Sequence, residues 1–513
     1  MCSNEDASSS ITQVLANAKN TEDRVKAHEI QILANAAQAK FQDAIRESSA
    51  ILGELGIDVS NVDPTSIQSE IVKTQSLLES SDITGQKLIH SLVSKPISSD
   101  SLQIGLMRIL CFSSRAAYAA NPPLMMYIIL KMVQNVILNE KITAESSYAF
   151  GALSVAFCGL GFHQEAHLAS KVALALLERF DRKYYNIIVC LVVTGSMPYR
   201  QPAQACIDLL RQSYRGACSV GDRDWARVSI NQISQLSIMA PERGKSLTDV
   251  EKEISQMLTE FPTEEEDSKS LIILAMQYLQ LLLNLKEVTS TSISSSIDPT
   301  LLTGSAMNQE DYLQICREKG VRDYFRYFYT SRLYLGYLFR RRDVSEEMVD
   351  VLEEIAAQGK FCSSFEMIVE TFYMGLVAAD ILQRQTTFDA ATDISRWRQL
   401  ANNSLNLLTQ WAKEGSEWNF RHKADLLRAE IAVANGDAAA AISSYQSAIL
   451  VAGKSSHINE EALSCERAGL FFVRQGEIEE GRVYLLRAET LYSAWGAHRK
   501  VQDVSSLIEE HCH

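Results

Sequence analysis

The chain has 513 residues, of which 46% are hydrophobic and 22% charged, so it has enough apolar side chains to fold and lacks the composition of a disordered protein. Its scarcity of proline, nine residues in all, and its tracts rich in Ala, Leu, Glu, Gln and Ser favour helices over strands. The formal charge of −14 argues against nucleic acid or an anionic membrane surface as the main partner.

The N-terminal residues and the cysteines indicate where the protein works. The first ten residues, MCSNEDASSS, are polar and acidic, whereas a secretory signal needs a basic end and an apolar core. The ten cysteines are scattered without a Cys-x-x-Cys pair, which is typical of reduced thiols. The apolar runs 124–138, 184–197 and 270–285 are too short or too interrupted to span a membrane. We therefore expect a soluble, cytoplasmic protein.

The N-terminal half of the chain has helical periodicity. Residues 1–20 are expected to be disordered, and apolar residues in 21–55 recur every three or four positions, which predicts one long helix or a tight hairpin ending at Gly56. The chain restarts at Asp63-Pro64, because proline suits a first helical turn. Further helices are expected at 67–80, 83–93, 99–120, 124–139 and 144–160.

A break in the pattern divides the chain into two expected lobes. Thr263 and Glu266 have the spacing of a capping box, which predicts the start of a helix. Residues 289–296 are almost wholly Ser and Thr, which indicates a flexible loop. We expect an N-terminal helical-repeat lobe at 21–261, a linker with one helix at 262–304 and a C-terminal lobe at 305–513.

A spaced pattern of small residues recurs along the chain. After a glycine, small or apolar residues follow at offsets of five, nine and twelve, as in two antiparallel helices joined by a tight turn. The four occurrences are Gly436, Ala441, Tyr445, Ala448; Gly476, Gly481, Leu485, Ala488; Gly161, Ala166, Ser170, Ala173; and, more weakly, Gly221, Ala226, Ile230, Ile233. The first two glycines are 40 residues apart. The pattern predicts an all-α, tetratricopeptide-like α-solenoid.

The stretch YFRYFYTSRLYLGYLFRRR mixes aromatic residues with arginines. It contains Tyr324, Arg326, Tyr327, Arg332, Arg340, Arg341 and Arg342. Stacking and phosphate contacts would make it a nucleic-acid site, but the acidic chain favours a buried helix whose arginines lie at the C-terminal end. Arginine and tyrosine are also enriched in binding hot spots, so we name the seven residues as a protein-binding patch.

Shorter motifs do not indicate catalysis or metal binding. Gly453-Lys454-Ser455 lacks the first glycine of a P-loop and is expected to be a helix cap. His163 and His167 have no accompanying metalloprotease motif, and His511-Cys512-His513 has no partner cluster at zinc spacing. No kinase loop, G-x-S-x-G elbow or histidine-kinase glycine box occurs in the sequence. We expect no catalytic residue, no cofactor and no bound metal.

The C-terminal stretch resembles the helical region of large multidomain signalling kinases. The residues that resemble it are Trp411-Ala412, Asn419-Phe420-Arg421-His422-Lys423, Ala429-Glu430, Glu460-Glu461-Ala462-Leu463, Tyr484-Leu485, Ala488, Tyr492, Trp495-Gly496-Ala497 and Lys500-Val501. Weaker likeness occurs at 117–122, 147–151 and Gly221-Asp222 with Ala226. The resemblance begins near residue 50, and its Trp-Gly-Ala ending is the most specific part.

This resemblance implies a role in signalling. Such proteins join a serine/threonine-kinase-like domain, an AAA-type ATPase, this helical region, a GAF sensor and a histidine kinase. The family's catalytic motifs are absent from the sequence, so we expect a non-catalytic scaffold that contacts kinase or ATPase modules in cis or in trans. The alternatives are a fragment of a larger predicted ATPase or hybrid sensor kinase, and a free-standing adaptor that binds peptide termini.

Overall fold

The computed structural model of the chain consists of α-helices joined by turns. It describes residues 13–15, 17–18, 20–38, 40–79, 85–180, 184–260, 266–286, 298–319, 322–357, 365–384 and 394–512. Within these ranges there is no strand, and the single β-bridge joins Ile97 and Ile142. The prediction of an all-α fold is confirmed.

The chain divides into two compact units, Met1–Ser196 and Met197–His513. This boundary precedes the linker expected at 262–304. Contacts made by the first helix of the second unit, α11 (Met197–Arg200), and by the residue after it explain the difference: Asn419 donates to the carbonyl oxygens of Pro198 and Gln201, both at 2.6 Å. Tyr199 also packs against Trp411 at a ring-centroid distance of 5.4 Å. The start of the second unit is thereby joined to helices more than 200 residues later.

The first unit is built from helix pairs. Its helices are α2 Thr21–Ala37, α3 Phe41–Glu54, α4 Pro64–Glu79, α5 Gln86–Ser94, α6 Ser101–Ala120, α7 Pro122–Leu138, α8 Glu145–Gly159, α9 His163–Leu177 and α10 Tyr185–Gly195, with a short 3₁₀ helix at Glu178–Phe180. Residues 21–55 form a hairpin, α2 and α3, rather than one helix. Lys95 stabilises the end of α7 by donating to three of its last carbonyl groups, including those of Val136 at 3.0 Å and Ile137 at 2.8 Å.

The second unit continues the same construction. Its helices are α11 Met197–Arg200, α12 Ala203–Ser219, α13 Arg223–Met239, α14 Leu247–Thr259, α15 Glu266–Lys286, α16 Gln309–Lys319, α17 Arg322–Leu338, α18 Arg342–Ala357, α19 Phe365–Gln383, α20 Ile394–Glu414, α21 Glu417–Ala434, α22 Ala438–Lys454, α23 Ile458–Arg474, α24 Ile478–Trp495 and α25 His498–His511. The expected cap at Thr263 and the Ser/Thr-rich loop at 289–296 lie outside the described residues.

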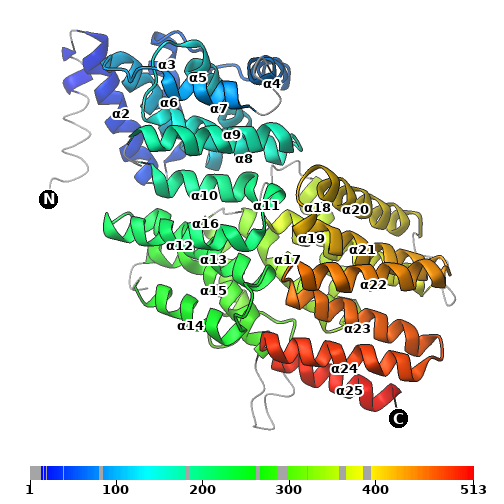
Figure 1. Ribbon diagram of the computed structural model, residues 1–513. Coiled ribbons are helices and arrows are strands. Elements are labelled where there is room, and N and C mark those ends of the chain that lie inside the picture. Colours follow the sequence, from blue (N-terminus) through cyan, green and yellow to red (C-terminus); the bar gives the residue numbers. More distant parts are fainter. Residues whose placement is uncertain are drawn as a thin grey trace. The chain divides into compact units, whose positions relative to one another are not determined.

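The C-terminal helices of this unit are of two kinds, and α21 to α25 lie side by side (Figure 1). The inner helices α19, α21 and α23 are buried on nearly all sides. The outer helices α20, α22 and α24 bury one stripe each, which in α22 consists of Ala441, Tyr445, Ala448, Ile449 and Ala452. This spacing of three and four residues places the stripe on one helical face, so the opposite face meets solvent.

Candidate functional site

The hairpin turns of both units share one backbone conformation. Gly161, Gly221, Gly436 and Gly476 have φ between +72° and +85°, the left-handed region in which a side chain is strained. In each turn the next N–H donates to a carbonyl five residues earlier, as from Asp437 to Ala432 at 2.9 Å. The four glycines of the sequence pattern therefore lie at equivalent helix ends.

Arg340 occupies the same place in the turn between α17 and α18. Its φ is +54°, and Arg341 N–H donates to the carbonyl of Gly336 at 2.8 Å. Ser345, five residues on, is buried, as the pattern requires. The sequence search missed this hairpin because it required a glycine at the turn, where this chain has Arg340.

The other pattern positions lie where the helices of a hairpin meet. The alanines among them, which are fully buried or nearly so, are Ala166, Ala173, Ala226, Ala441, Ala448, Ala488 and Ala497. Tyr445 and Trp495 are buried with them, and Gly496 has a φ of +90°. A Cβ on Gly481 would lie 2.9 Å from the carbonyl oxygen of Gly469, so α23 and α24 approach closely there.

The predicted protein-binding patch extends from the first turn of α17 to the first residue of α18, and most of its arginines form internal ion pairs. Arg326 binds Glu370 through two hydrogen bonds of 2.7 and 2.8 Å. The other pairs are Arg340 with Glu466 and Asp503, Arg341 with Asp298 and Asp343, and Arg342 with Asp380. Tyr324, Tyr327 and Arg332 are half-buried. The binding role of the patch stays a prediction.

Buried ion pairs join successive inner helices. Arg467 of α23 donates to both carboxylate oxygens of Glu430 of α21, at 2.9 and 2.6 Å, and Tyr445 donates to the same carboxylate at 2.7 Å. Lys500 of α25 binds Glu466 of α23 at 2.8 Å. These charged side chains are almost fully buried. Each ion pair therefore supplies hydrogen bonds in place of those that its two members lose to water.

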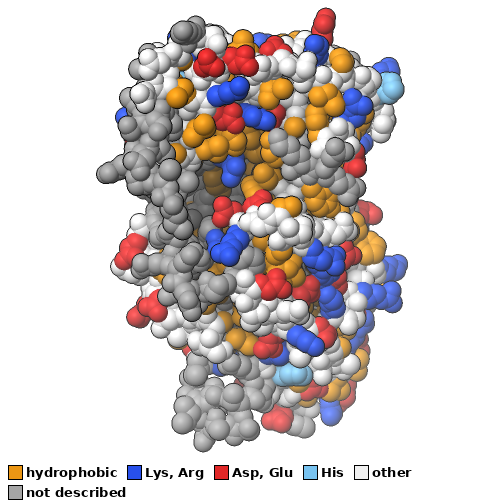
Figure 2. All heavy atoms as spheres, turned by 90° about the vertical axis from the view of Figure 1, so that its left-hand side faces the viewer, with side chains coloured by type: hydrophobic (Ala, Val, Ile, Leu, Met, Phe, Trp, Pro, Cys, Tyr) orange, Lys and Arg blue, Asp and Glu red, His pale blue; other side chains and the backbone are white. Residues whose placement is uncertain are grey.

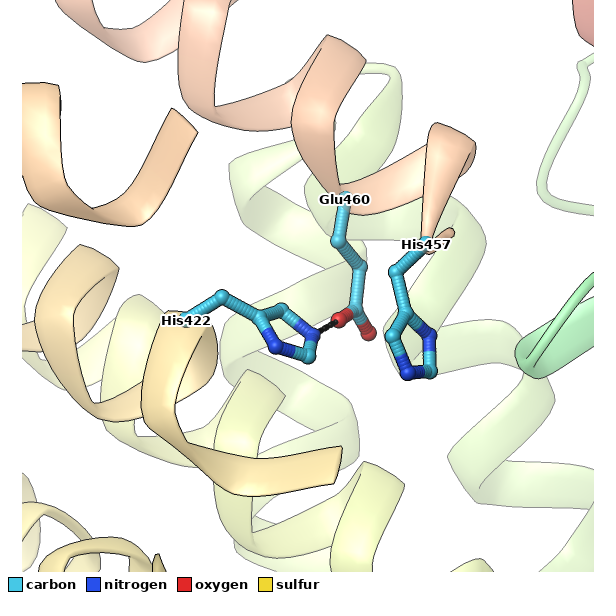
Figure 3. Close-up of side chains that lie close together, drawn as sticks. All are labelled: His422, His457 and Glu460. Atoms are coloured by element: carbon cyan, nitrogen blue, oxygen red, sulfur yellow. Dashed lines mark hydrogen bonds and ion pairs between the residues drawn. The ribbon is translucent and has the colours of Figure 1, made fainter. Parts of the chain in front are cut away.

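A third pair lies within a buried cluster of His422, Lys423, His457 and Glu460. Figure 3 shows three of these side chains, His422, His457 and Glu460. His422 and Lys423 are on α21, Glu460 is in the first turn of α23, and His457 precedes that helix. Lys423 donates to Glu460 Oε2 at 2.6 Å, and His422 Nε2 contacts the same oxygen. The two imidazole rings are stacked with centroids 4.5 Å apart.

Burial and charge set the protonation states of this cluster. Burial lowers the pKa of His422 and of His457, and the nearby Lys423 ammonium lowers both further, so both rings are neutral at pH 7. Burial alone would raise the pKa of Glu460, but Lys423 and the histidines outweigh it and hold the pKa of this carboxyl well below its usual range. Burial also lowers the pKa of Lys423, and the Glu460 carboxylate opposes this effect, so the cluster contains one ammonium, one carboxylate and two neutral imidazoles.

Two histidines and a glutamate form a donor set of the kind that binds zinc. One donor atom of each of His422, His457 and Glu460 lies within 4.8 Å of the others. However, Lys423 Nζ is 2.6 Å from Glu460 Oε2 and 3.2 Å from His422 Nε2, which places an ammonium group where a metal cation would bind. The geometry makes Lys423 the cation of this cluster and gives the cluster a structural role.

The shorter sequence motifs lie apart from these clusters. His163 and His167 lie in the first turns of α9, and Gly453-Lys454-Ser455 forms the end of α22. His511 ends α25, and His513 lies outside the described residues. None of these motifs joins the group His422, His457 and Glu460.

Acidic and basic side chains are interspersed on the face drawn in Figure 2. Among the described side chains of that face, no extended basic area of the kind that binds a phosphate backbone is visible. None of the described helices combines the length and the apolar character that crossing a bilayer requires.

Comparison with known proteins gives no match: no protein-family model, curated protein or solved structure is significantly similar to the sequence. The resemblance to the helical region of signalling kinases therefore stays a prediction.

Proposed function

We propose that this chain is a non-catalytic protein-interaction scaffold made of tetratricopeptide-like hairpins. The proposed setting is a signal-transduction system, in which the hairpins contact ATPase or kinase modules, as in the proteins that the sequence resembles. The proposal includes the cytoplasmic location expected from the sequence.

The observation behind this proposal is the exposure of apolar side chains on the outer helices. Leu450 on α22 is 57% exposed, and Val483 and Leu486 on α24 are 61% and 43% exposed. The inner helices, in contrast, are covered by other parts of the same unit. Partner contacts are therefore expected on the outer helices, where burial of these side chains would favour association.

The test is partner capture by the full chain and by a variant in α24. Val483→Glu with Leu486→Glu places two charges on the exposed face, and Ile30→Glu with Leu33→Glu makes the same change on α2, where both residues are also exposed. We expect mass spectrometry to identify a kinase or ATPase partner that the wild type and the α2 variant retain and the α24 variant loses. Equal capture by all three proteins would contradict the assignment of this face, and nucleotide turnover by the pure chain would contradict the non-catalytic role.

A further inference from the structure

A narrow recess in the second unit is lined mainly by arginines. It lies where α18 begins and where α19 and α23 end, and its cavity has a volume of about 40 Å³, enough for about three water molecules. Its charged lining residues in the described part of the chain are Arg340, Arg342, Arg384, Arg467, Arg474 and Asp380. Five arginines and one aspartate thus line the same small volume, and some of these arginines also form ion pairs with carboxylates that do not line it, Arg340 with Glu466 and Asp503 and Arg384 with Glu346.

Asp380 holds three of these arginines in place. Its carboxylate is 3.1 Å from Arg342 Nε, 3.4 Å from Arg384 Nε and 3.5 Å from a terminal nitrogen of Arg467. Glu430 binds Arg467 from the other side at 2.6 Å. The guanidinium groups are therefore fixed before any ligand arrives, which reduces the entropy lost on binding.

Two arginines at the recess keep most of their hydrogen-bonding capacity. A guanidinium has five N–H donors. Within the described residues, Arg474 makes one side-chain hydrogen bond, to the amide oxygen of Gln383 at 3.0 Å, and no ion pair. Arg342 uses only its Nε, toward Asp380, and 53% of its side chain is exposed. Their terminal N–H groups are thus available to a ligand that enters from solvent.

A buried hydroxyl group in the same lining also lacks a partner. Tyr337 is 7% exposed, and its hydroxyl makes no hydrogen bond within the described structure. A buried polar group without a partner is unfavourable, because it has lost its hydrogen bonds to water. An acceptor oxygen in the recess would satisfy this hydroxyl, so the tyrosine provides evidence, independent of the arginines, for a ligand that carries acceptor oxygens.

We propose that this recess binds a phosphoryl group. Its donors belong to separate helices and converge from several directions, which suits the three terminal oxygens of a tetrahedral phosphoryl group better than the two oxygens of a planar carboxylate. The group can be inorganic phosphate or a phosphorylated side chain, because the recess recognises the chemistry that they share. This inference does not depend on the proposed scaffold role.

The strained turn at Arg340 supports the presence of a binding site. A non-glycine residue in the left-handed region is strained, and such strain clusters at functional sites. Arg340 remains there because Glu466 and Asp503 bind its guanidinium at 2.8 and 2.6 Å. A glycine would have satisfied the turn without placing a charge beside the recess.

The first experiment titrates the full chain with inorganic phosphate at constant ionic strength, monitored by ³¹P NMR and calorimetry. We expect millimolar binding by the wild type and a loss of about tenfold or more in Arg474→Gln and Arg342→Gln, because each variant removes charge-assisted hydrogen bonds. Arg487→Gln is the matched control, because Arg487 is an exposed arginine paired with Glu461 outside the recess. No binding by the wild type, or equal binding by Arg474→Gln, overturns the proposal.

A second variant distinguishes binding from a purely structural role. Asp380→Asn removes the negative charge that repels an anion but keeps an amide oxygen that can still accept hydrogen bonds from the arginines and hold them in place, so phosphate affinity should rise severalfold even if stability falls. Unchanged or weaker phosphate binding by folded Asp380→Asn contradicts the proposed geometry. Equal affinity for acetate overturns the assignment to a tetrahedral anion. Tighter binding of O-phosphoserine than of inorganic phosphate places the phosphoryl group on a protein partner, whereas equal binding indicates free phosphate.

Discussion

Replacing Lys423 with methionine tests the proposed role of the His–Lys–Glu cluster. Lys423 is 2% exposed and binds Glu460, which is 4% exposed, at 2.6 Å. Methionine keeps most of the chain length beside the Phe372 ring, over which the ammonium group now lies at 5.7 Å, but has no charge. The buried carboxylate of Glu460 then loses its cation, and breaking a buried pair in this way costs about 3–5 kcal/mol.

Tryptophan fluorescence reports on this unit alone. All five tryptophans of the chain, Trp225, Trp397, Trp411, Trp418 and Trp495, lie in the second unit. Denaturant unfolding followed by their emission should show a midpoint shift for Lys423→Met that corresponds to about 3–5 kcal/mol. Circular dichroism, which reports on both units, should show the first unit's transition unchanged.

A double variant shows whether the loss arises from charge. Adding Glu460→Gln removes the uncompensated carboxylate, so Lys423→Met with Glu460→Gln should regain most of the lost stability. A cost below about 1 kcal/mol for Lys423→Met would refute the reasoning. So would a double variant no more stable than the single one.

Three further predictions concern other buried groups of the second unit. The free energy of unfolding should fall as the pH drops below 6.5, by up to about 1.4 kcal/mol per pH unit for each of His422 and His457. The reason is that the pKa values of both histidines are lowered in the folded state, so the unfolded chain binds more protons. Denaturant midpoints at several pH values measure this fall. Burial and the neighbouring Glu370 raise the pKa of Glu366, a buried residue of α19, to about 8, so the contribution of this carboxyl to stability falls as the pH rises from about 4.5 to 8. The histidines act in the opposite direction below pH 6.5, so wild-type stability should decline between about pH 6.5 and 8, and Glu366→Gln should reduce this decline in the same measurement. Gly481→Ala should destabilise the second unit by about 1–3 kcal/mol in fluorescence-monitored unfolding, because its Cβ would lie 2.9 Å from a carbonyl oxygen of α23.

The structural features that could be predicted from the sequence are those that depend on residues close together in the chain. Glycines with positive φ are required by the turn itself, so Gly436 and Gly476 could be found from their spacing to small residues. The all-α class likewise follows from composition and periodicity. Arg340 could not be found in this way, because distant carboxylates hold it in a conformation that its own residue type disfavours.

The buried charges escaped detection because their partners lie one hairpin apart. Lys423 is 37 residues from Glu460, and Glu430 is also 37 residues from Arg467. Helical periodicity gives no reason to expect that a lysine or an arginine is buried rather than exposed. The equal separation of two opposite-charge pairs, close to the repeat length of 40, was the only available signal.

Buried ion pairs between residues about one repeat apart in the sequence influence how successive hairpins stack. Replacing such a pair with apolar residues is often neutral or stabilising, so stability alone does not account for them. A sliding of α23 along α21 by one helical turn would separate Lys423 from Glu460 and Glu430 from Arg467 together, leaving four buried charges unpaired. We therefore expect the pairs to fix the register of successive hairpins. A fixed register keeps the outer helices, with Leu450, Val483 and Leu486, in a constant arrangement for a partner to recognise.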